Sequence, residues 1–231
     1  MNFDLSGFGP ALAAGTLMTV QLALSALCLG LVLGLLGAFA KTSPYKPLQW
    51  LGGTYSTIVR GVPELLWVML IYFSTVNVLR ELGESLGVGS LELSPFAAGV
   101  IALGLCFGAY ATEVFRGAIL AIPKGHREAG QALGMSKPRI LWRVVMPQMW
   151  RIAMPGLGNL FMILMKDTAL VSVIGLTEIM RQSQIAVTAT KQAMTFYLVA
   201  AIIYLSLTVI SMIGLHFLEK RASRGFVRST Q

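Results

Sequence analysis

The stretch LSGFGPALAAGTLMTVQLALSALCLGLVLGLLGAFA, residues 5–40, decides the fold because it contains no charged residue. A helix needs about 20 apolar residues to cross the hydrocarbon core of a bilayer, and this stretch is long enough. We therefore expect a membrane-spanning helix over residues 12–38, preceded by a tail of residues 1–11. The first five residues lack the basic segment of a signal peptide and include the acidic Asp4, so we expect this span to stay in the mature protein.

The composition of the whole chain agrees with a membrane protein. Of its 231 residues, 55% are apolar and 12% are charged, and the mean hydropathy is +0.73. A soluble domain carries about 25% charged residues. Cys28 and Cys106 both lie in apolar stretches, which favours packing roles over a disulfide framework. The net charge of +8 does not indicate nucleic-acid binding, because the basic residues sit in short loops beside apolar segments, where they orient a membrane protein.

Outward from the first span, four further segments are long enough to cross as helices, which satisfy their own backbone hydrogen bonds in lipid. The expected spans are residues 12–38, 60–80, 95–116, 153–175 and 195–217. The fold class is therefore an all-α integral membrane protein with five transmembrane helices. We interpret the semi-apolar residues 47–59 as an interfacial lead-in to the second span, residues 119–152 as a loop, and residues 218–231 as a basic tail.

The distribution of Lys and Arg between the loops predicts the orientation. Most of them follow the first, third and fifth spans: Lys41, Lys46, Lys124, Arg127, Lys137, Arg139, Arg143, Arg151, Lys220, Arg221, Arg224 and Arg228. The segments on the other side contribute Arg181 and Lys191. Because basic residues accumulate in the cytoplasm, we expect the N-terminus outside the cell and the C-terminus in the cytoplasm.

Small residues recur at helical spacing within the spans. Ala26, Gly30 and Gly34 are four residues apart, and Gly104 and Gly108 repeat the spacing. Such residues let two helix backbones approach closely. The approach could lie inside one subunit or at an interface between subunits.

The loop of residues 119–152 reads as two short helices joined at Gly134. The sequence EAGQAL, residues 128–133, contains good helix formers and ends at this glycine, which suits a left-handed C-terminal cap. Ser136 can cap the next helix, and we expect Pro147 to end it. Such an elbow could fit a groove on a cytosolic partner or lie flat on anionic lipid, and physical reasoning leaves both open.

The same loop carries a spaced motif. Its elements are Glu128, Ala129, Gly130, then Gly134 after three residues, then Val144, Val145, Met146 and Pro147 after nine more. This resembles the EAA signature of ATP-binding-cassette importer permeases, which is E-A-A, three residues, G, nine residues and I-x-L-P. Gly130, Val144 and Met146 depart from that signature conservatively, and the spacing is intact.

The resemblance covers about residues 10–220 and extends to the polar amino acid permeases. It includes RGVP at residues 60–63, AYATEVFRG at 109–117 and KDTALVS at 166–172. The chain is similar to the subunit of the histidine or lysine–arginine–ornithine systems that pairs with a second, related permease. The resemblance implies a type I importer fold in a bacterial inner membrane, with a periplasmic N-terminus.

The resemblance also implies the partners. They are a second permease subunit in a heterodimer, a cytosolic ATPase dimer, a periplasmic substrate-binding protein and membrane lipid, with no nucleic acid. The chain has no G-x-x-x-x-G-K-[ST] phosphate loop, so we expect a non-catalytic subunit without a cofactor, driven by a partner or by an ion gradient. The implied ATPase-coupling residues are Glu128, Ala129, Gly130, Gly134 and Pro147, with Glu128 as a polar contact or cap, Gly134 as the elbow and Pro147 as the stop.

Ionisable residues inside spans cost roughly 2.5–3.5 kcal/mol each on insertion scales, so each one calls for a functional hypothesis. Glu113 and Arg116 are three residues apart on one helix face, and we expect a structural ion pair. Lys166 and Asp167 are adjacent and cannot face each other, so each needs its own partner, in a fixed interhelical contact or in transport.

The candidate residues of a substrate pathway are Glu64, Asn159, Lys166, Asp167 and Thr168. The carboxylate of Glu64 could meet a cationic substrate or its binding protein, or pair with Arg60 or the partner permease. Leu160 stands where relatives can have a glutamate, so the main pocket can equally belong to the partner subunit.

The expected function is translocation of basic amino acids, namely arginine or ornithine and also lysine or histidine, by alternating access. The alternative is a permease for another polar amino acid such as glutamine. An ion-coupled carrier is disfavoured because five spans show no inverted repeat. A membrane-embedded enzyme is disfavoured because the histidines are only His126 and His216 and no metal or nucleophile constellation is visible.

Overall fold

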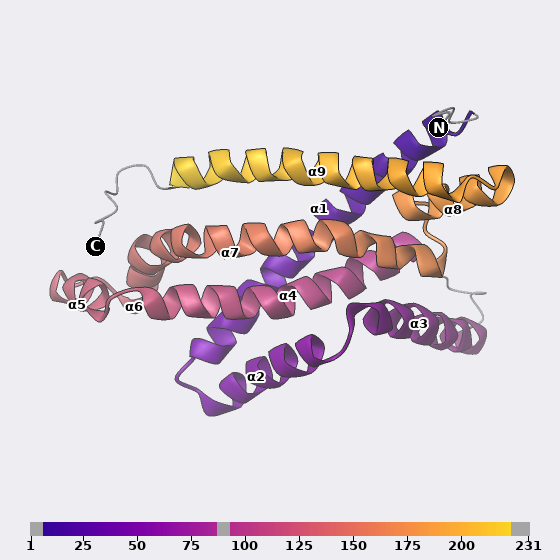
Figure 1. The fold of residues 1–231 in the computed structure, drawn as a ribbon. Coiled ribbons are helices and arrows are strands. Elements are labelled where there is room, and N and C mark those ends of the chain that lie inside the picture. The colour runs from indigo at the N-terminus through magenta and orange to yellow at the C-terminus, as the bar shows by residue number, and fades with distance from the viewer. Residues whose placement is uncertain (1–6, 87–92, 223–231) are drawn as a thin grey trace.

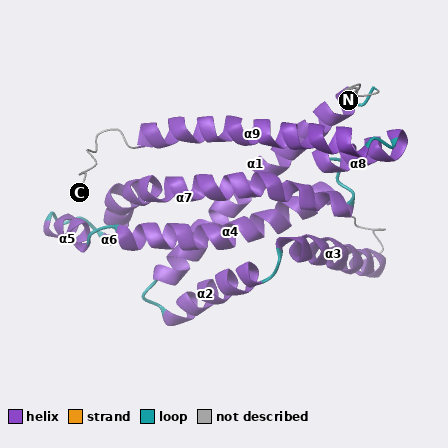
Figure 2. Cartoon of the chain, viewed as in Figure 1, coloured by secondary structure: helices purple, strands orange, loops and turns teal. Residues whose placement is uncertain are grey.

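The computed structural model describes residues 7–86 and 93–222, and these residues are helical without a strand. Figures 1 and 2 show the order of the helices. They are α1 (Gly9–Thr42), α2 (Lys46–Gly61), α3 (Glu64–Leu86), α4 (Pro95–Ala121), α5 (Lys124–Ala132), α6 (Lys137–Ile140), a π-helical turn (Leu141–Val145), α7 (Met146–Asp167), a 3-10 segment (Thr168–Ile174), α8 (Ile179–Thr190) and α9 (Ala193–Ala222). Parts of the expected tails and of the loop 81–94 lie outside the described residues, and so do Arg224 and Arg228.

The expected all-α membrane fold is confirmed at the level of helices. Four helical segments in the described part of the chain are long and apolar enough to cross a membrane: Gly9–Thr42, Pro95–Ala121, Lys137–Ile174 and Ala193–Arg221. The bent pair of α2 and α3 supplies a fifth if it forms one span. Which side each terminus faces stays a prediction.

The second span differs from its expected form. Residues 60–80 do not form one helix, because α2 ends at Gly61 and α3 begins at Glu64, with an angle of 104° between them. Val62, the residue before Pro63, has extended backbone angles, since a proline disfavours helical geometry in the residue before it. Arg60 therefore belongs to α2, and residues 47–59, the expected lead-in, are helical throughout.

The prediction that Pro147 ends a helix is wrong. Pro147 lies in the first turn of α7, and the chain stays helical from Lys137 to Ile174. A proline inside a helix lacks an N–H and clashes with the carbonyl four residues earlier. The π-helical turn just before it, closed by the Met146 N–H donating to the Leu141 carbonyl, is where the helix accommodates this residue. The loop is therefore continuous with the fourth span.

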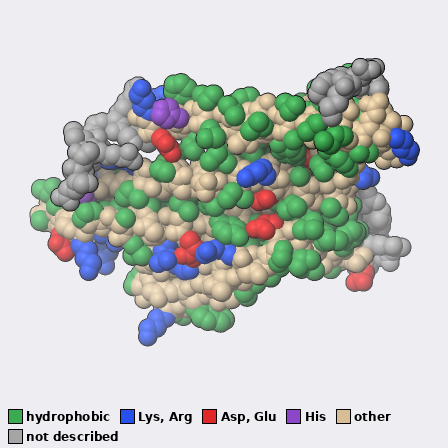
Figure 3. All heavy atoms as spheres, in the orientation of Figure 1, with side chains coloured by type: hydrophobic (Ala, Val, Ile, Leu, Met, Phe, Trp, Pro, Cys, Tyr) green, Lys and Arg blue, Asp and Glu red, His purple; other side chains and the backbone are tan. Residues whose placement is uncertain are grey.

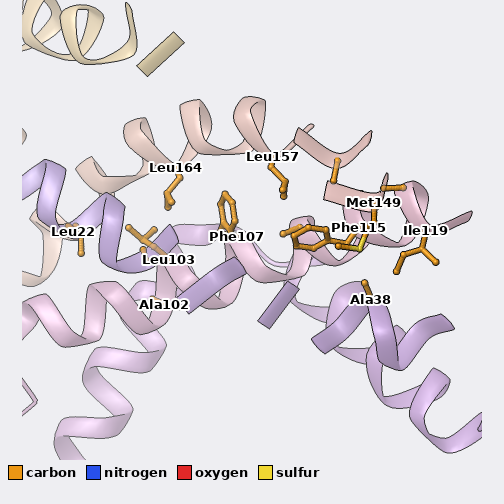
Figure 4. Close-up of a cluster of buried hydrophobic side chains, with 14 of the residues drawn as sticks. Leu22, Ala38, Ala102, Leu103, Phe107, Phe115, Ile119, Met149, Leu157 and Leu164 are labelled. Carbon is orange, nitrogen blue, oxygen red and sulfur yellow. The ribbon is translucent and has the colours of Figure 1, made fainter. Parts of the chain in front are cut away.

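The small residues bring α1 and α4 together inside one subunit. A Cβ atom on Gly30 would lie 2.5 Å from Cδ1 of Phe107, and one on Gly34 would lie 2.6 Å from the Cβ of Ala111. In Figure 1, α1 runs obliquely behind α4 and α7. Figure 4 shows the buried core, in which Phe107 of α4 and Leu164 of α7 belong to the same cluster as Leu22 and Ala38 of α1. The spacing of small residues thus fixes the packing that holds α4 at the centre of the bundle.

Candidate functional site

A cavity of about 150 Å³ lies between the start of α3, the middle of α4 and the C-terminal half of α7. Its lining is Glu64, Leu103, Cys106, Phe107, Tyr110, Leu160, Ile163, Leu164 and Asp167. We call it the acidic pocket, because both of its charged residues are carboxylates. Leu160 contributes an apolar wall.

The two carboxylates reach the acidic pocket from helix ends. Glu64 is the first residue of α3, where the helix dipole stabilises a negative charge, and its Oε1 accepts a hydrogen bond of 3.2 Å from the Tyr110 hydroxyl. Asp167 is the last residue of α7 and is followed directly by the 3-10 segment Thr168–Ile174. Both side chains are half-buried. The pocket therefore presents negative charge that its own lining does not balance, which suits an ammonium or guanidinium group.

The other candidate pathway residues do not line this pocket. Asn159 and Lys166 lie on an exposed face of α7 together with Ile163, which also lines the pocket. Thr168 is fully buried, and its hydroxyl donates to the Met165 carbonyl at 2.7 Å. The structure thus brings Glu64 and Asp167 together, leaves Asn159 and Lys166 on the adjoining surface, and puts Thr168 in the core.

A second charged group surrounds Glu113, one turn along α4 from Tyr110. The Glu113 carboxylate accepts hydrogen bonds from Lys41 Nζ, from Ser56 Oγ at 3.0 Å and from Arg116 Nε at 2.9 Å. Arg60 Nη1 lies 3.8 Å from Glu113 Oε1. We call these five residues the Glu113 cluster. Figure 3 shows acidic and basic side chains gathered on this face, in the region where α2 and α4 run side by side.

The sequence indicated only part of this cluster. Arg116 could be found from its spacing to Glu113, whereas Lys41 comes from α1 and both Ser56 and Arg60 come from α2. Arg60 is directed to this cluster rather than to Glu64, and its guanidinium lies 5.3 Å from the centroid of the Tyr110 ring. Tyr110 therefore stands between the acidic pocket and the Glu113 cluster.

The predicted elbow in the loop of residues 119–152 has the expected geometry at Gly134. Gly134 has φ of +72°, its N–H donates to the Gln131 carbonyl, and the Met135 N–H donates to the Gly130 carbonyl. These two bonds close the end of α5 in the manner of a glycine cap. Ser136 occupies the N-cap position of α6 without a side-chain hydrogen bond to the helix.

The two short helices pack on each other and leave one side free. Gly130 is buried, and a Cβ there would lie 3.0 Å from Cγ1 of Ile140. Glu128 and Ala129 are exposed. Leu133 is 81% exposed and Trp142 is 66% exposed. A projecting elbow with large exposed apolar side chains is typical of a surface that a partner covers.

The sequence did not indicate one buried carboxylate, that of Glu178, which joins α8 to α9. Glu178 is fully buried at the N-cap of α8. It accepts hydrogen bonds from the Met180 and Arg181 N–H groups and from the Tyr204 hydroxyl at 2.9, 2.8 and 2.8 Å. Burial raises the pKa of the Glu178 carboxyl, and these three hydrogen bonds partly oppose that rise. Its position just before a helix could have suggested an N-cap role. Glu178 lies outside every predicted span, however, so no sequence pattern indicated that it would be buried.

A family model described as "Binding-protein-dependent transport system inner membrane component" matches residues 11–224. The arginine ABC transporter permease protein ArtQ of Escherichia coli strain K12 is 44% identical over 230 residues, covering 94% of this chain and 96% of ArtQ. The histidine/lysine/arginine/ornithine transport system permease protein HisQ of the same strain is 40% identical over 225 residues, covering 97% of this chain and 99% of HisQ.

One solved structure, titled "Crystal structure of an amino acid ABC transporter with histidines", superposes with a TM-score of 0.81. It is 32% identical to this chain, and the match covers 96% of this chain and 99% of that one. The resemblance read from the spaced motifs is therefore confirmed.

Proposed function

The chain belongs to the family of binding-protein-dependent transport system inner membrane components, and we propose that it is a permease subunit that passes basic amino acids through the acidic pocket. The relatives ArtQ and HisQ are named for arginine and for histidine, lysine, arginine and ornithine. Arginine and ornithine are the proposed substrates, with lysine and histidine in the same class. The subunit is non-catalytic, and a partner ATPase supplies the energy.

The observation that carries the substrate class is the pairing of Glu64 with Asp167 in one cavity. Placing two carboxylates inside a membrane costs free energy unless a cation binds between them. A passing guanidinium or ammonium group would form charge-assisted hydrogen bonds with both. An uncharged amide such as glutamine would leave the charge of the pocket unbalanced.

The exposed face of α7 beside the pocket supports a second permease as partner. Asn159, Ile163 and Lys166 follow one another at helical spacing on this face. A polar and a charged residue on a membrane helix need cover from protein or water. We infer that a related permease subunit packs here to form a heterodimer, so that the acidic pocket opens to the pathway between the two subunits. Alternating access then follows from rocking of the subunits about the pocket.

The elbow of α5 and α6 is the proposed site of ATPase docking. It projects from one end of the bundle in Figure 1, and the excess of basic residues at that end supports a cytoplasmic location. Leu133 and Trp142 supply an apolar contact, and Glu128 supplies a polar one. Since α6 continues into α7 without a break, movement of the elbow is transmitted to the helix that carries Asp167. A periplasmic binding protein would deliver substrate at the opposite end.

Co-purification with the partner ATPase tests this assignment. Glu128→Arg and Leu133→Asp alter the exposed side of the elbow without touching the acidic pocket. We expect both variants to lose most of the bound ATPase, while the control Arg181→Glu, a charge reversal of an exposed residue on α8, retains it. Undiminished ATPase binding by both elbow variants would contradict the coupling role.

A further inference from the structure

A second, larger cavity of about 650 Å³ lies between the end of α1, the start of α2 and the coupling elbow. Its lining includes the apolar residues Leu36, Phe39 and Leu48 and the basic residues Arg127 and Lys137. We call it the elbow groove. It is separate from the acidic pocket and has no residue in common with it.

The elbow groove is amphipathic along its length. Leu36 and Phe39 line it on the last apolar turns of α1, and the hydroxyl residues Thr42 and Ser43 follow them. Its charged lining residues, Arg127 and Lys137, come from α5 and α6. Arg127 Nη2 also donates to the Ile119 carbonyl at 3.4 Å, which holds the guanidinium at the rim.

The elbow groove lies at the level where the hydrocarbon core ends. The charge-free stretch of residues 5–40 stops at Lys41, which is the residue next to the apolar part of the lining. Lysine and arginine side chains at helix ends reach toward lipid headgroups. An apolar cavity that opens to two cations at this depth matches an amphiphile that has acyl chains and a negative headgroup.

We propose that the elbow groove binds an anionic phospholipid, whose phosphate is held by Arg127 and Lys137. The acyl chains lie against Leu36, Phe39 and Leu48. Because the bound lipid touches α1 and α2 on one side and α5 and α6 on the other, it braces the coupling elbow against the membrane-embedded bundle. The inference requires that the chain spans a membrane, and it is independent of which substrate the acidic pocket takes.

The charge of the elbow groove favours an anionic lipid over an apolar peptide as its occupant. Both charged residues of the lining are positive, so a neutral or basic occupant would leave two cations beside an apolar wall. Basic residues near a membrane surface attract anionic lipids, and each strengthens the attraction several-fold. Removing both cations should therefore weaken retention of an anionic lipid by about tenfold or more.

Lipid retention by the purified full-length permease complex tests the proposal. The complex is placed in nanodiscs of phosphatidylcholine with a minority of phosphatidylglycerol, extracted into detergent, and its retained phosphatidylglycerol is measured by mass spectrometry. The double variant R127Q/K137Q should lose this lipid, while K124Q/R139Q should keep it. Lys124 and Arg139 lie on the same two helices and are exposed, but they do not line the elbow groove, so the control removes equal charge from the same elbow.

A second variant tests the apolar part. Leu48→Trp adds bulk to a 43% exposed lining residue without changing charge, and it should also lower retention of phosphatidylglycerol. Equal retention by the wild type and by both groove variants would overturn the proposal. So would a loss of bound ATPase without loss of lipid in R127Q/K137Q, because the groove would then be covered by the ATPase. Retained lipid is measured without any transport step, so the result does not depend on whether the proposed transport function is correct.

Discussion

Glu113 of α4 accepts a hydrogen bond from Lys41 at the end of α1, a residue 72 positions earlier in the chain. The same carboxylate also accepts hydrogen bonds from Ser56 of α2 and from Arg116 of its own helix. One partly buried carboxylate thus joins α1, α2 and α4 at the end of the bundle from which the elbow projects.

Replacing Glu113 with Gln should destabilise the bundle. Lys41, Arg60 and Arg116 would lose their shared counter-charge, and hydrogen bonds to charged groups contribute roughly 1.5–3 kcal/mol each. We expect a thermal unfolding midpoint several degrees lower for the detergent-solubilised protein. Glu81→Gln is the matched control, because Glu81 is exposed near the end of α3. Equal midpoints for the two variants would mean that the Glu113 cluster does not hold the helices together.

Removing a negative charge from the acidic pocket should weaken the binding of cationic substrates during transport. Glu64→Gln and Asp167→Asn each remove one charged acceptor, and each should raise the KM for arginine uptake by roughly tenfold, the cost of one charge-assisted hydrogen bond. Assembly with the partner subunits should be retained. The apolar lining variant Ile163→Leu should behave as the wild type. Loss of assembly in parallel with uptake would instead give the two carboxylates a structural role.

The elbow depends on a left-handed residue at position 134. Gly134→Ala places a Cβ at φ of +72°, which costs about 1–2 kcal/mol, and should shift the angle between α5 and α6. We expect weaker stimulation of ATP hydrolysis by arginine and its binding protein. Gly125→Ala is the control, since a Cβ there meets nothing within 4 Å and alanine favours a helix. Identical stimulation of ATP hydrolysis in both variants would show that Gly134 has no role in coupling.

The contact of α1 with α4 should tolerate no added methyl group at Gly30. Gly30→Ala forces its Cβ against the Phe107 ring, and overpacking of this kind costs typically 1–3 kcal/mol. The expected result is a lower unfolding midpoint. Gly117→Ala on α4 should be neutral, because its surroundings are open. A midpoint for Gly30→Ala equal to that of Gly117→Ala would show that the two helices can separate at no cost.

The features that the sequence predicted are those encoded locally. The charge-free residues 5–40 specify α1 by length alone, and the spacing from Glu128 to Gly134 specifies the elbow because a glycine cap needs only neighbouring residues. The Gly30 and Gly34 spacing indicated a close helix contact, but it could not name α4 as the partner.

The features that it missed depend on tertiary contacts or on subtle backbone geometry. Lys41, Ser56 and Arg60 reach Glu113 from other helices, so no spacing rule links them. Pro147 suggested a helix end, yet a π-helical turn lets the helix continue. Glu178 is ionisable and fully buried, and its burial follows from the packing of α8 against α1 and α9.

The most direct measurement is ATP-dependent uptake of radiolabelled arginine into proteoliposomes that hold this permease with its second permease, its ATPase and its binding protein. We expect uptake that needs ATP and that unlabelled arginine or ornithine suppresses while glutamine does not. Uptake that continues without the ATPase, or that glutamine alone suppresses, would contradict this expectation.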